Sequence, residues 1–233
     1  MCGRYTLVNL AALTDLFPWI GGPPTDVPPR YNIAPSQPIL AVDNEHPDQW
    51  DFFLWGLIPA WAKDPTIGNK LCNARAETLA EKNTFKNAYR RRRCAIPADG
   101  FYEWRLSADG KTKQPVYIRR KGHKPFALAG LWETWQNPSG GGEELQTATI
   151  ITTRPNELMT DIHARMPVML DERTLKRWLE PGEKKPGELD DLLAPYPARD
   201  MEAYPVSKQV NTPRNDGPDL IKEIQPEKTT LFG

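Results

Sequence analysis

The chain has 233 residues, 39% of them hydrophobic and 26% charged, and its formal net charge is zero. This length is enough to bury one sizeable core, and a zero net charge gives no support for tight, non-specific binding to duplex DNA. No run approaches the roughly 20 apolar residues of a membrane span, and no basic leader precedes the first apolar stretch, so a soluble, cytoplasmic protein without a membrane partner is expected.

Cysteine and charge placement narrow the class further. Three widely spaced cysteines, Cys2, Cys72 and Cys94, lack a paired ligand motif, which argues against a disulfide framework and against a structural zinc site. Residues 1–124 hold 18 Lys and Arg against 12 Asp and Glu, whereas residues 125–233 hold 12 against 18. A neutral protein with one basic side can still bind a polyanion through local contacts.

Short apolar runs bounded by Gly, Pro, Asn and Asp predict a protein rich in strands. The predicted strands are 5–7, 39–42, 50–55, 94–96, 101–104, 116–119, 126–135, 146–153 and 204–206. Asp109 and Gly110 predict a hairpin turn before the sixth of them, and 126–135 and 146–153 are expected to be neighbours in one sheet.

Helical spacing is confined to shorter stretches. The predicted helices are 10–17, 78–89, 156–162 with Asn156 as N-cap, 171–179 with Asp171 as cap, and 189–193. The four arginines at 90–93 are interpreted as a solvated face, with phosphate contact as the less favoured alternative.

These elements predict an α+β fold with a single domain, a mostly antiparallel barrel-like sheet and several short flanking helices. The domain is expected to span 1–225, with a flexible tail at 226–233. No glycine-rich turn between a strand and a helix suggests a nucleotide, so no cofactor and no metal are expected.

Cys2 carries the first chemical signal. If Met1 is removed, Cys2 offers a thiol and an α-amine on adjacent carbons, with ordinary pKa values of about 8.5 and about 7.7–8.0. Such a 1,2-aminothiol forms an imine with an aldehyde and closes on it through sulfur, giving a thiazolidine that an internal cysteine cannot make. The plain alternative is an incidental residue at a frayed terminus.

Three downstream segments supply polar groups suited to proton transfer and orientation. They hold Asn73 with Arg75 and Glu77, Glu103 beside Trp104, and His163 with Arg165. Each alone is weak, because Glu103 at a strand end and His163 on a surface are commonly just exposed.

Together with the N-terminus, these segments resemble the SOS response-associated peptidase family, whose members are also called abasic-site processing proteins. The motifs are MCGRY at 1–5, RYNIAP at 30–35, WGLIP at 55–59, NARAE at 73–77, GFYEW at 100–104 and HARMP at 163–167. They occur in the expected order from Cys2 to about Asn211, and six co-occurring motifs are far more specific than any one.

The resemblance implies a sensor of abasic sites in single-stranded DNA that crosslinks itself reversibly to the lesion through Cys2 after removal of Met1. It assigns proton transfer to the sugar ring oxygen to His163, and proton shuttling and crosslink reversal to Glu103. Burial beside Trp104 is expected to raise the pKa of Glu103. Asn73 is expected to hold the nucleophile in place.

The same resemblance points to DNA contacts. Arg4, Arg75 and Arg165 are expected to hold phosphates, with internal ion pairs as the alternative, and Trp61 and Trp104 are expected to stack on bases. The expected partner is single-stranded DNA with abasic sites, the replication machinery is a further candidate, and a monomer is expected. In a bacterium, this predicts association with the nucleoid.

Three other functions stay open on the residues alone. One is a cysteine peptidase, acting at least on its own Met1, with Cys2 as nucleophile and His163 as base. Another is an amidotransferase with an N-terminal nucleophile, whose motifs after Gly3 do not match. The third is a module that binds modified DNA without a covalent step, for which Cys2 is dispensable.

Overall fold

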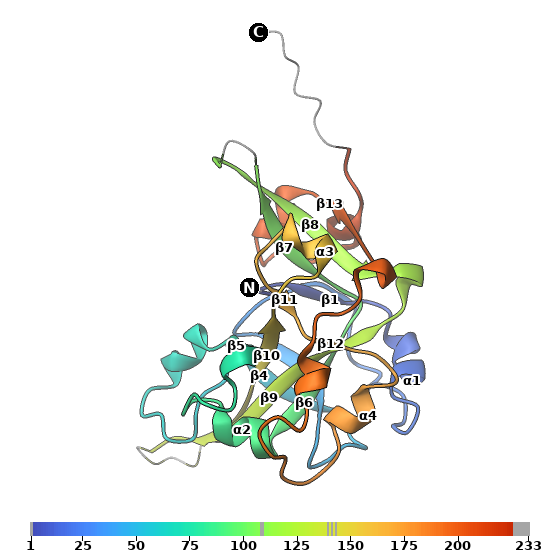
Figure 1. The fold of residues 1–233 in the computed structure, drawn as a ribbon. Helices are drawn as coiled ribbons and strands as arrows, with labels where there is room; N and C mark the ends of the chain where they lie inside the picture. Colours follow the sequence, from blue (N-terminus) through green and yellow to red (C-terminus); the bar gives the residue numbers. More distant parts are fainter. Residues whose placement is uncertain (1, 108–109, 139, 141, 143, 226–233) are drawn as a thin grey trace.

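Five strands close into a barrel at the centre of the computed structural model, which describes residues 2–107, 110–138, 140, 142 and 144–225 (Figure 1). The barrel strands are β3 (Pro38–Asp43), β4 (Asp51–Trp55), β6 (Arg93–Ala98), β9 (Phe126–Gln136) and β10 (Glu144–Thr153). They pair in the order β10, β4, β3, β6, β9, and β9 pairs again with β10. The β10–β4 pair is parallel and the other four pairs are antiparallel.

Long stretches of the barrel strands are apolar and covered on both faces, although β4 exposes Phe52. Every residue of β6 is buried, as are the first seven residues of β9. Gly130 of β9 is required by close packing, since a Cβ there would lie 2.8 Å from Cys94 Sγ and 2.9 Å from the Thr149 carbonyl oxygen. The side chains inside this barrel therefore form the centre of the hydrophobic core.

Three short strands extend the barrel sheet beside the N-terminus. β5 (Asn73–Arg75) pairs in parallel with β10, β11 (Met166–Pro167) pairs antiparallel with β10, and β12 (Met169–Leu170) pairs antiparallel with β9. These pairings bring the 73–75 and 166–167 segments to the same end of β10.

A second, fully antiparallel sheet lies against the barrel. Its order is β13 (Met201–Pro205), β8 (Lys113–Arg120), β7 (Gly100–Leu106), β1 (Tyr5–Leu7) and β2 (Arg30–Ile33). In Figure 1 the β7–β8 hairpin rises above the barrel, and β1 lies near the place where the two sheets meet.

The helices are short and lie around the sheets. The α-helices are α1 (Leu13–Leu16), α2 (Lys86–Arg91), α3 (Glu157–Thr160) and α4 (Leu175–Trp178). The 3₁₀ turns are Leu10–Ala12, Pro65–Lys70, Ala76–Thr78, Lys121–His123, Asp190–Leu193, Ala198–Asp200, Lys208–Asn211 and Pro218–Ile221. The predicted fold class, an α+β domain with a mostly antiparallel barrel-like sheet and short flanking helices, is confirmed.

The predicted helix 78–89 is wrong over its first half. Residues 79–85 form turns, and the α-helix is confined to Lys86–Arg91, because buried Leu79 and Phe85 are six residues apart and so cannot share a helical face. The predicted helix 171–179 shortens to α4, and 189–193 contains a 3₁₀ turn. Asn156 caps α3 as predicted, its side chain accepting a hydrogen bond from the Met159 N–H.

The four consecutive arginines do not form one solvated face. Arg90 and Arg91 pair with Glu183 at the surface, and Arg92 pairs with Glu133. Arg93 is fully buried and donates to the main-chain carbonyl oxygens of residues 90, 178, 180 and 182. The solvated interpretation is therefore wrong for Arg93, whose charge is compensated by peptide dipoles.

Two predicted features fall outside the described part of the chain, namely Asp109 of the hairpin turn and the tail at 226–233. Among the described residues, no helix has both the length and the apolar character that crossing a membrane requires.

Candidate active site

Cys2 is buried between the second sheet and the end of β10, and the Asn73 side chain holds it there. The Asn73 Nδ2 donates to the Cys2 carbonyl oxygen over 2.9 Å, and Cys2 has no exposed surface. Asn73 opens β5, whose parallel pairing with Ile150 of β10 fixes the amide. Asn73 therefore lies against the backbone of Cys2, and its role in catalysis stays a prediction.

Glu103 reaches the same place from β7. Because Tyr5 pairs with Phe101 and the Tyr102 N–H donates to the Arg4 carbonyl oxygen, β7 runs beside the N-terminal segment. The Glu103 side chain is 3% exposed, and its Oε1 lies 3.9 Å from Nδ1 of His163. A carboxyl group, an imidazole and the buried Cys2 thus converge from three distant parts of the sequence.

Burial controls the protonation of this group. Removal from water raises the pKa of the Glu103 carboxyl, and the nearby His163 opposes that rise. Burial also raises the pKa of the Cys2 thiol far above its ordinary value, and the charge of Glu103 adds to the effect. The thiol is therefore held protonated near neutral pH, and Glu103 keeps its proton to a higher pH than an exposed carboxyl group does.

The expected cause of the Glu103 shift was wrong in one respect. Trp104 follows Glu103 on a strand, so the two side chains point to opposite faces of the sheet. Trp104 packs on the far face against the cluster that contains Tyr102 and Val206, and its Nε1 donates to Asn211 Oδ1 over 2.7 Å. The burial of Glu103 therefore comes from the other face of β7.

His163 lies at the rim of the site, with 30% of its side chain exposed. The Arg165 N–H donates to His163 Nδ1 over 3.1 Å, and the Arg165 carbonyl oxygen lies at the same distance from that nitrogen. When the ring is neutral, the hydrogen bond from the Arg165 N–H to Nδ1 favours the tautomer that carries its proton on Nε2. When the ring is protonated, Nδ1 can instead donate to the Arg165 carbonyl oxygen.

The three predicted DNA-binding arginines differ in their surroundings. Arg4 is half-buried, its Nε is buried without a hydrogen-bond partner, and it makes no ion pair with any described residue. Arg75 is exposed and likewise makes no ion pair within the described chain. Arg165 pairs with Glu77 through both guanidinium nitrogens, over 2.7 and 2.9 Å. Arg4 and Arg75 are therefore open to an anion, and the charge of Arg165 is neutralised by Glu77.

A model of the family described as SOS response associated peptidase (SRAP) matches residues 1–213 of this chain. The chain belongs to this family.

Relatives and solved structures agree with the family model. The chain is 49% identical over 227 residues to the abasic site processing protein YoqW of Bacillus subtilis, covering 95% of this chain and 99% of the relative. It is 34% identical over 192 residues to the abasic site processing protein HMCES of Gallus gallus, covering 73% of this chain and 56% of the relative. A crystal structure of a Bacteroides thetaiotaomicron protein superposes with a TM-score of 0.82 at 28% identity, covering 96% and 100% of the two chains.

The tryptophans predicted to contact DNA are placed differently in this SRAP domain. Trp61 is 63% exposed and borders a shallow hollow that Ile67, Lys63 and Lys70 also line. Trp104 is only partly exposed and lies on the face of β7 away from Glu103. Trp61 is thus available for stacking, whereas Trp104 is engaged with the C-terminal segment.

Two further residues, Cys72 and Trp55, support the SRAP site without any predicted role. The Cys72 thiol accepts from Asn73 Nδ2 over 3.4 Å, and the Cys72 carbonyl oxygen accepts from the buried Trp55 Nε1 over 2.9 Å. Trp55 thus supports the segment that holds Cys2. The available signal was their presence in or next to two of the family motifs, WGLIP and NARAE.

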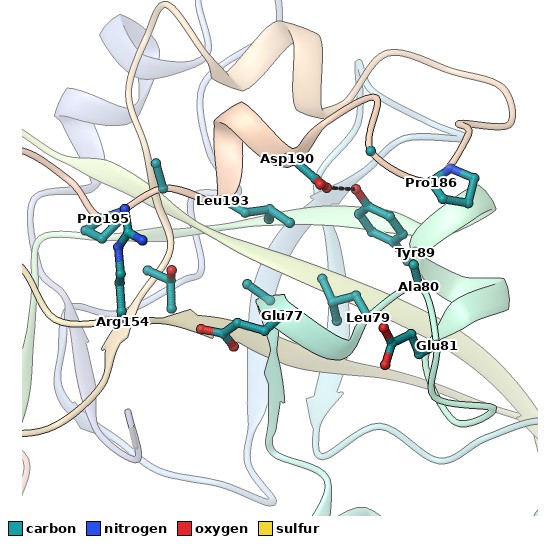
Figure 2. A pocket seen from close by; sticks show the side chains of 14 residues that line it. Glu77, Leu79, Ala80, Glu81, Tyr89, Arg154, Pro186, Asp190, Leu193 and Pro195 are labelled. Atoms are coloured by element: carbon teal, nitrogen blue, oxygen red, sulfur yellow. Dashed lines mark hydrogen bonds between the residues drawn. The ribbon is translucent and has the colours of Figure 1, made fainter.

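A hollow adjoins the site on the far side of Glu77. Figure 2 shows Glu77 on its floor, Arg154 and Pro195 at one end, and the hydrogen-bonded pair of Tyr89 and Asp190 at the other. Glu77 therefore stands between this hollow and Arg165. Among the described residues, no group of three or more His, Cys, Asp and Glu side chains is placed to hold a metal ion.

Proposed function

We propose that this protein, once Met1 is removed, captures abasic sites in single-stranded DNA by forming a thiazolidine between the lesion aldehyde and Cys2. The observation that carries this proposal is the convergence of Asn73, Glu103 and His163 on a buried cysteine that becomes N-terminal by loss of one residue. The names of the YoqW and HMCES relatives, both abasic site processing proteins, support the same lesion as the substrate.

The proposed reaction has two covalent steps. The Cys2 α-amine attacks the aldehyde of the ring-opened deoxyribose, and loss of one water from the carbinolamine leaves an imine. The Cys2 sulfur then bonds to the imine carbon while its proton passes to the nitrogen, which closes the five-membered ring. One water is released overall, and no redox partner is needed.

Glu103 and His163 divide the proton transfers between them. The Cys2 thiol is held protonated by burial, so a nearby base must accept its proton before sulfur attacks. Glu103 can do so and return the proton to the ring nitrogen, which also serves the reverse reaction. His163, at the exposed rim, is placed to protonate or orient the sugar oxygen as the ring opens.

Asn73 positions the nucleophile through its Nδ2 and leaves its Oδ1 available to accept a further hydrogen bond. Its Nδ2 is committed to the Cys2 carbonyl oxygen, whereas its Oδ1 is buried without a hydrogen-bond partner among the described residues. A buried acceptor left unpaired costs about 1–3 kcal/mol, which a donor on the lesion or on the freed α-amine would recover. This oxygen therefore favours a bound substrate.

The DNA strand would be held by Arg4 and Arg75 through phosphates and by Trp61 through base stacking. Arg165 and Trp104 belong to the same proposed set, but Arg165 must share its guanidinium with Glu77. Trp104 would contact DNA only through the part of its ring left free by Asn211. Association with replication proteins, a monomeric state and a cytoplasmic or nucleoid location stay predictions.

The decisive experiment incubates purified protein with single-stranded DNA carrying one abasic site and separates the products on a denaturing gel. The intact N-terminus is read by mass spectrometry, and Cys2→Ala and a preparation that retains Met1 are run beside it. A shifted band is expected only for the chain that begins at Cys2, because the other two lack the aminothiol.

Each other outcome has a definite meaning. An equal band from Cys2→Ala would contradict the proposal, and DNA retention without any covalent band would favour the non-covalent module. Cysteine-dependent cleavage of a peptide substrate would favour the peptidase, and release of ammonia from glutamine would favour the amidotransferase.

A further inference from the structure

Glu77 and Arg165 form a bidentate salt bridge at the edge of the site. The Glu77 carboxylate oxygens accept from Nη1 and Nη2 of Arg165 over 2.7 and 2.9 Å. Nη2 also donates to the carbonyl oxygen and the hydroxyl of Thr152, over 2.5 and 3.3 Å. The guanidinium is thereby fixed to two elements, the turn after β5 and the end of β10.

The backbone of Arg165 also orients the imidazole ring of His163. The Arg165 N–H donates to His163 Nδ1, and Arg165 directly precedes β11, which pairs with β10 at Thr152 and Thr153. A contact that fixes Arg165 therefore also fixes the ring orientation of His163, which faces Glu103. Arg165 thus links Glu77 to His163, since it is hydrogen-bonded to both.

We propose that Glu77 is a positioning residue, which orients His163 for the reaction at Cys2 by clamping Arg165, at the expense of Arg165's attraction for DNA phosphate. This inference rests on the proposed function. It follows from a bidentate carboxylate–guanidinium contact, which gives directional constraint as well as charge neutralisation.

The two consequences of the clamp have opposite signs. Removing the carboxylate frees a positive charge beside the DNA path, so DNA affinity rises or stays constant. It also loosens Arg165 and the imidazole that Arg165 holds, so the chemical step slows. A residue needed only for folding would weaken both, and a residue needed only for charge balance would leave the chemical step unchanged.

The test compares Glu77→Gln with Glu81→Gln in the full chain after removal of Met1. Glu81 is an exposed neighbour that lines the same hollow and makes no ion pair with any described residue, so its change removes the same charge (Figure 2). Binding is measured on single-stranded DNA with a tetrahydrofuran abasic analogue, which has no aldehyde. Crosslinking is measured as the single-turnover rate at saturating abasic DNA.

For Glu77→Gln we expect a rate about tenfold lower, with an unchanged or lower Kd for the analogue and a salt slope steeper by roughly 0.7. For Glu81→Gln we expect a rate within about twofold of the parent protein. A Glu77→Gln rate within twofold of the parent, or a joint loss of rate, affinity and thermal stability, would overturn the inference.

A second readout separates this inference from the proposed function. The ring nitrogens of His163, one of three histidines in the chain, report its tautomer by NMR. We expect the Nε2–H form in the parent protein and in Glu81→Gln, and a mixture in Glu77→Gln. If the parent protein fails to crosslink, the proposed function falls while this measurement still decides the role of Glu77, because an unchanged tautomer refutes it.

Discussion

The carboxyl group of Glu103 is a buried acid whose side chain faces the interior of the site, while its neighbour Trp104 faces the other side of the same strand. Burial raises the pKa of this carboxyl above its ordinary value of 4.5. The folded protein therefore keeps a proton on Glu103 at pH values where the unfolded chain has lost it. Stability contributed by this group falls as pH rises from the unfolded pKa through the folded one.

Replacing Glu103 with Gln removes that titration and predicts a more stable protein. At pH 8, Glu103→Gln is expected to melt at a higher temperature than the parent protein, with roughly 2–4 °C for each 1 kcal/mol gained. The difference is expected to shrink toward pH 4, where both side chains are neutral. Differential scanning calorimetry across this range tests it, and a gap that widens on acidification would contradict the direction of the shift.

The same substitution is expected to slow reversal of the crosslink more than it changes DNA binding. Opening the thiazolidine needs a proton on the departing sulfur as the nitrogen lone pair re-forms the imine, and the acid form of Glu103, which can supply it, is lost as pH rises through its raised pKa. Release of DNA from the purified crosslink should thus fall with pH in the parent protein and stay low and flat in Glu103→Gln. Equal release rates in the two proteins would remove Glu103 from this step.

At the scale of elements, β1 follows the N-terminal segment and pairs with β7, which contains both Glu103 and Gly100. Thr6 pairs with Gly100, and a Cβ on Gly100 would lie 2.4 Å from the Tyr117 ring. That ring has little room to move, because its hydroxyl is 2.8 Å from Thr6 Oγ1 and Tyr102 and Tyr204 pack against it. The Tyr117 ring of β8 can therefore reach Thr6 of β1 only because residue 100 has no side chain.

Gly100→Ala is accordingly expected to destabilise the protein by about 1–3 kcal/mol through overpacking. Gly22→Ala is the matched control, since nothing lies within 4 Å of a Cβ at Gly22. Thermal melting of the two variants measures the difference. If both melt with the parent protein, the sheet tolerates the extra methyl group and the packing argument is wrong.

The longer strands were predicted, but the short strands β2, β5, β11 and β12 were not, and the helices were predicted only in part. Strands such as β9 and β10 are covered on both faces, so their apolar runs stand out in the sequence. The helical stretches are one or two turns long, too short for a period of 3.6 to distinguish a helix from successive turns, as residues 79–85 show. The prediction that Arg93 is solvated failed for a related reason. A run of charged residues does not show which main-chain carbonyl oxygens the fold will bring close to each of them.

At the scale of the whole molecule, the site draws on segments near residues 2, 73, 103 and 163 that meet only after the barrel closes. The sequence motifs and the family resemblance allowed these residues to be grouped, but no local pattern reveals their distances. The contact between Glu77 and Arg165 joins residues that are 88 positions apart in the sequence. Conversely, Glu103 and Trp104 are adjacent in the sequence but lie on opposite faces of β7. Both depend on pairing register, which the sequence leaves open until β1, β5, β7 and β11 are placed.

The distribution of free and paired cations predicts how the protein responds to salt. Because its net charge is zero, long-range attraction to DNA is small, and local phosphate contacts should dominate. Arg4 and Arg75 make no ion pair with any described residue, whereas Arg90 and Arg91 both pair with Glu183. The arginine-rich surface at 90–91 is therefore expected to contribute little, although it is the most basic stretch of the sequence.

Arg4→Ala and Arg75→Ala are each expected to reduce the steepness of log K against log salt by roughly 0.7, the value for one phosphate contact on a single strand. Arg91→Ala, which removes the same charge from the paired surface, is expected to leave the slope unchanged. Fluorescence anisotropy with the tetrahydrofuran-containing strand, titrated at several salt concentrations, gives the slopes. A reduced slope for Arg91→Ala with none for Arg4→Ala or Arg75→Ala would move the DNA path to α2. The reverse result would place the strand over the Cys2 end of the barrel, where the reactive aldehyde must lie.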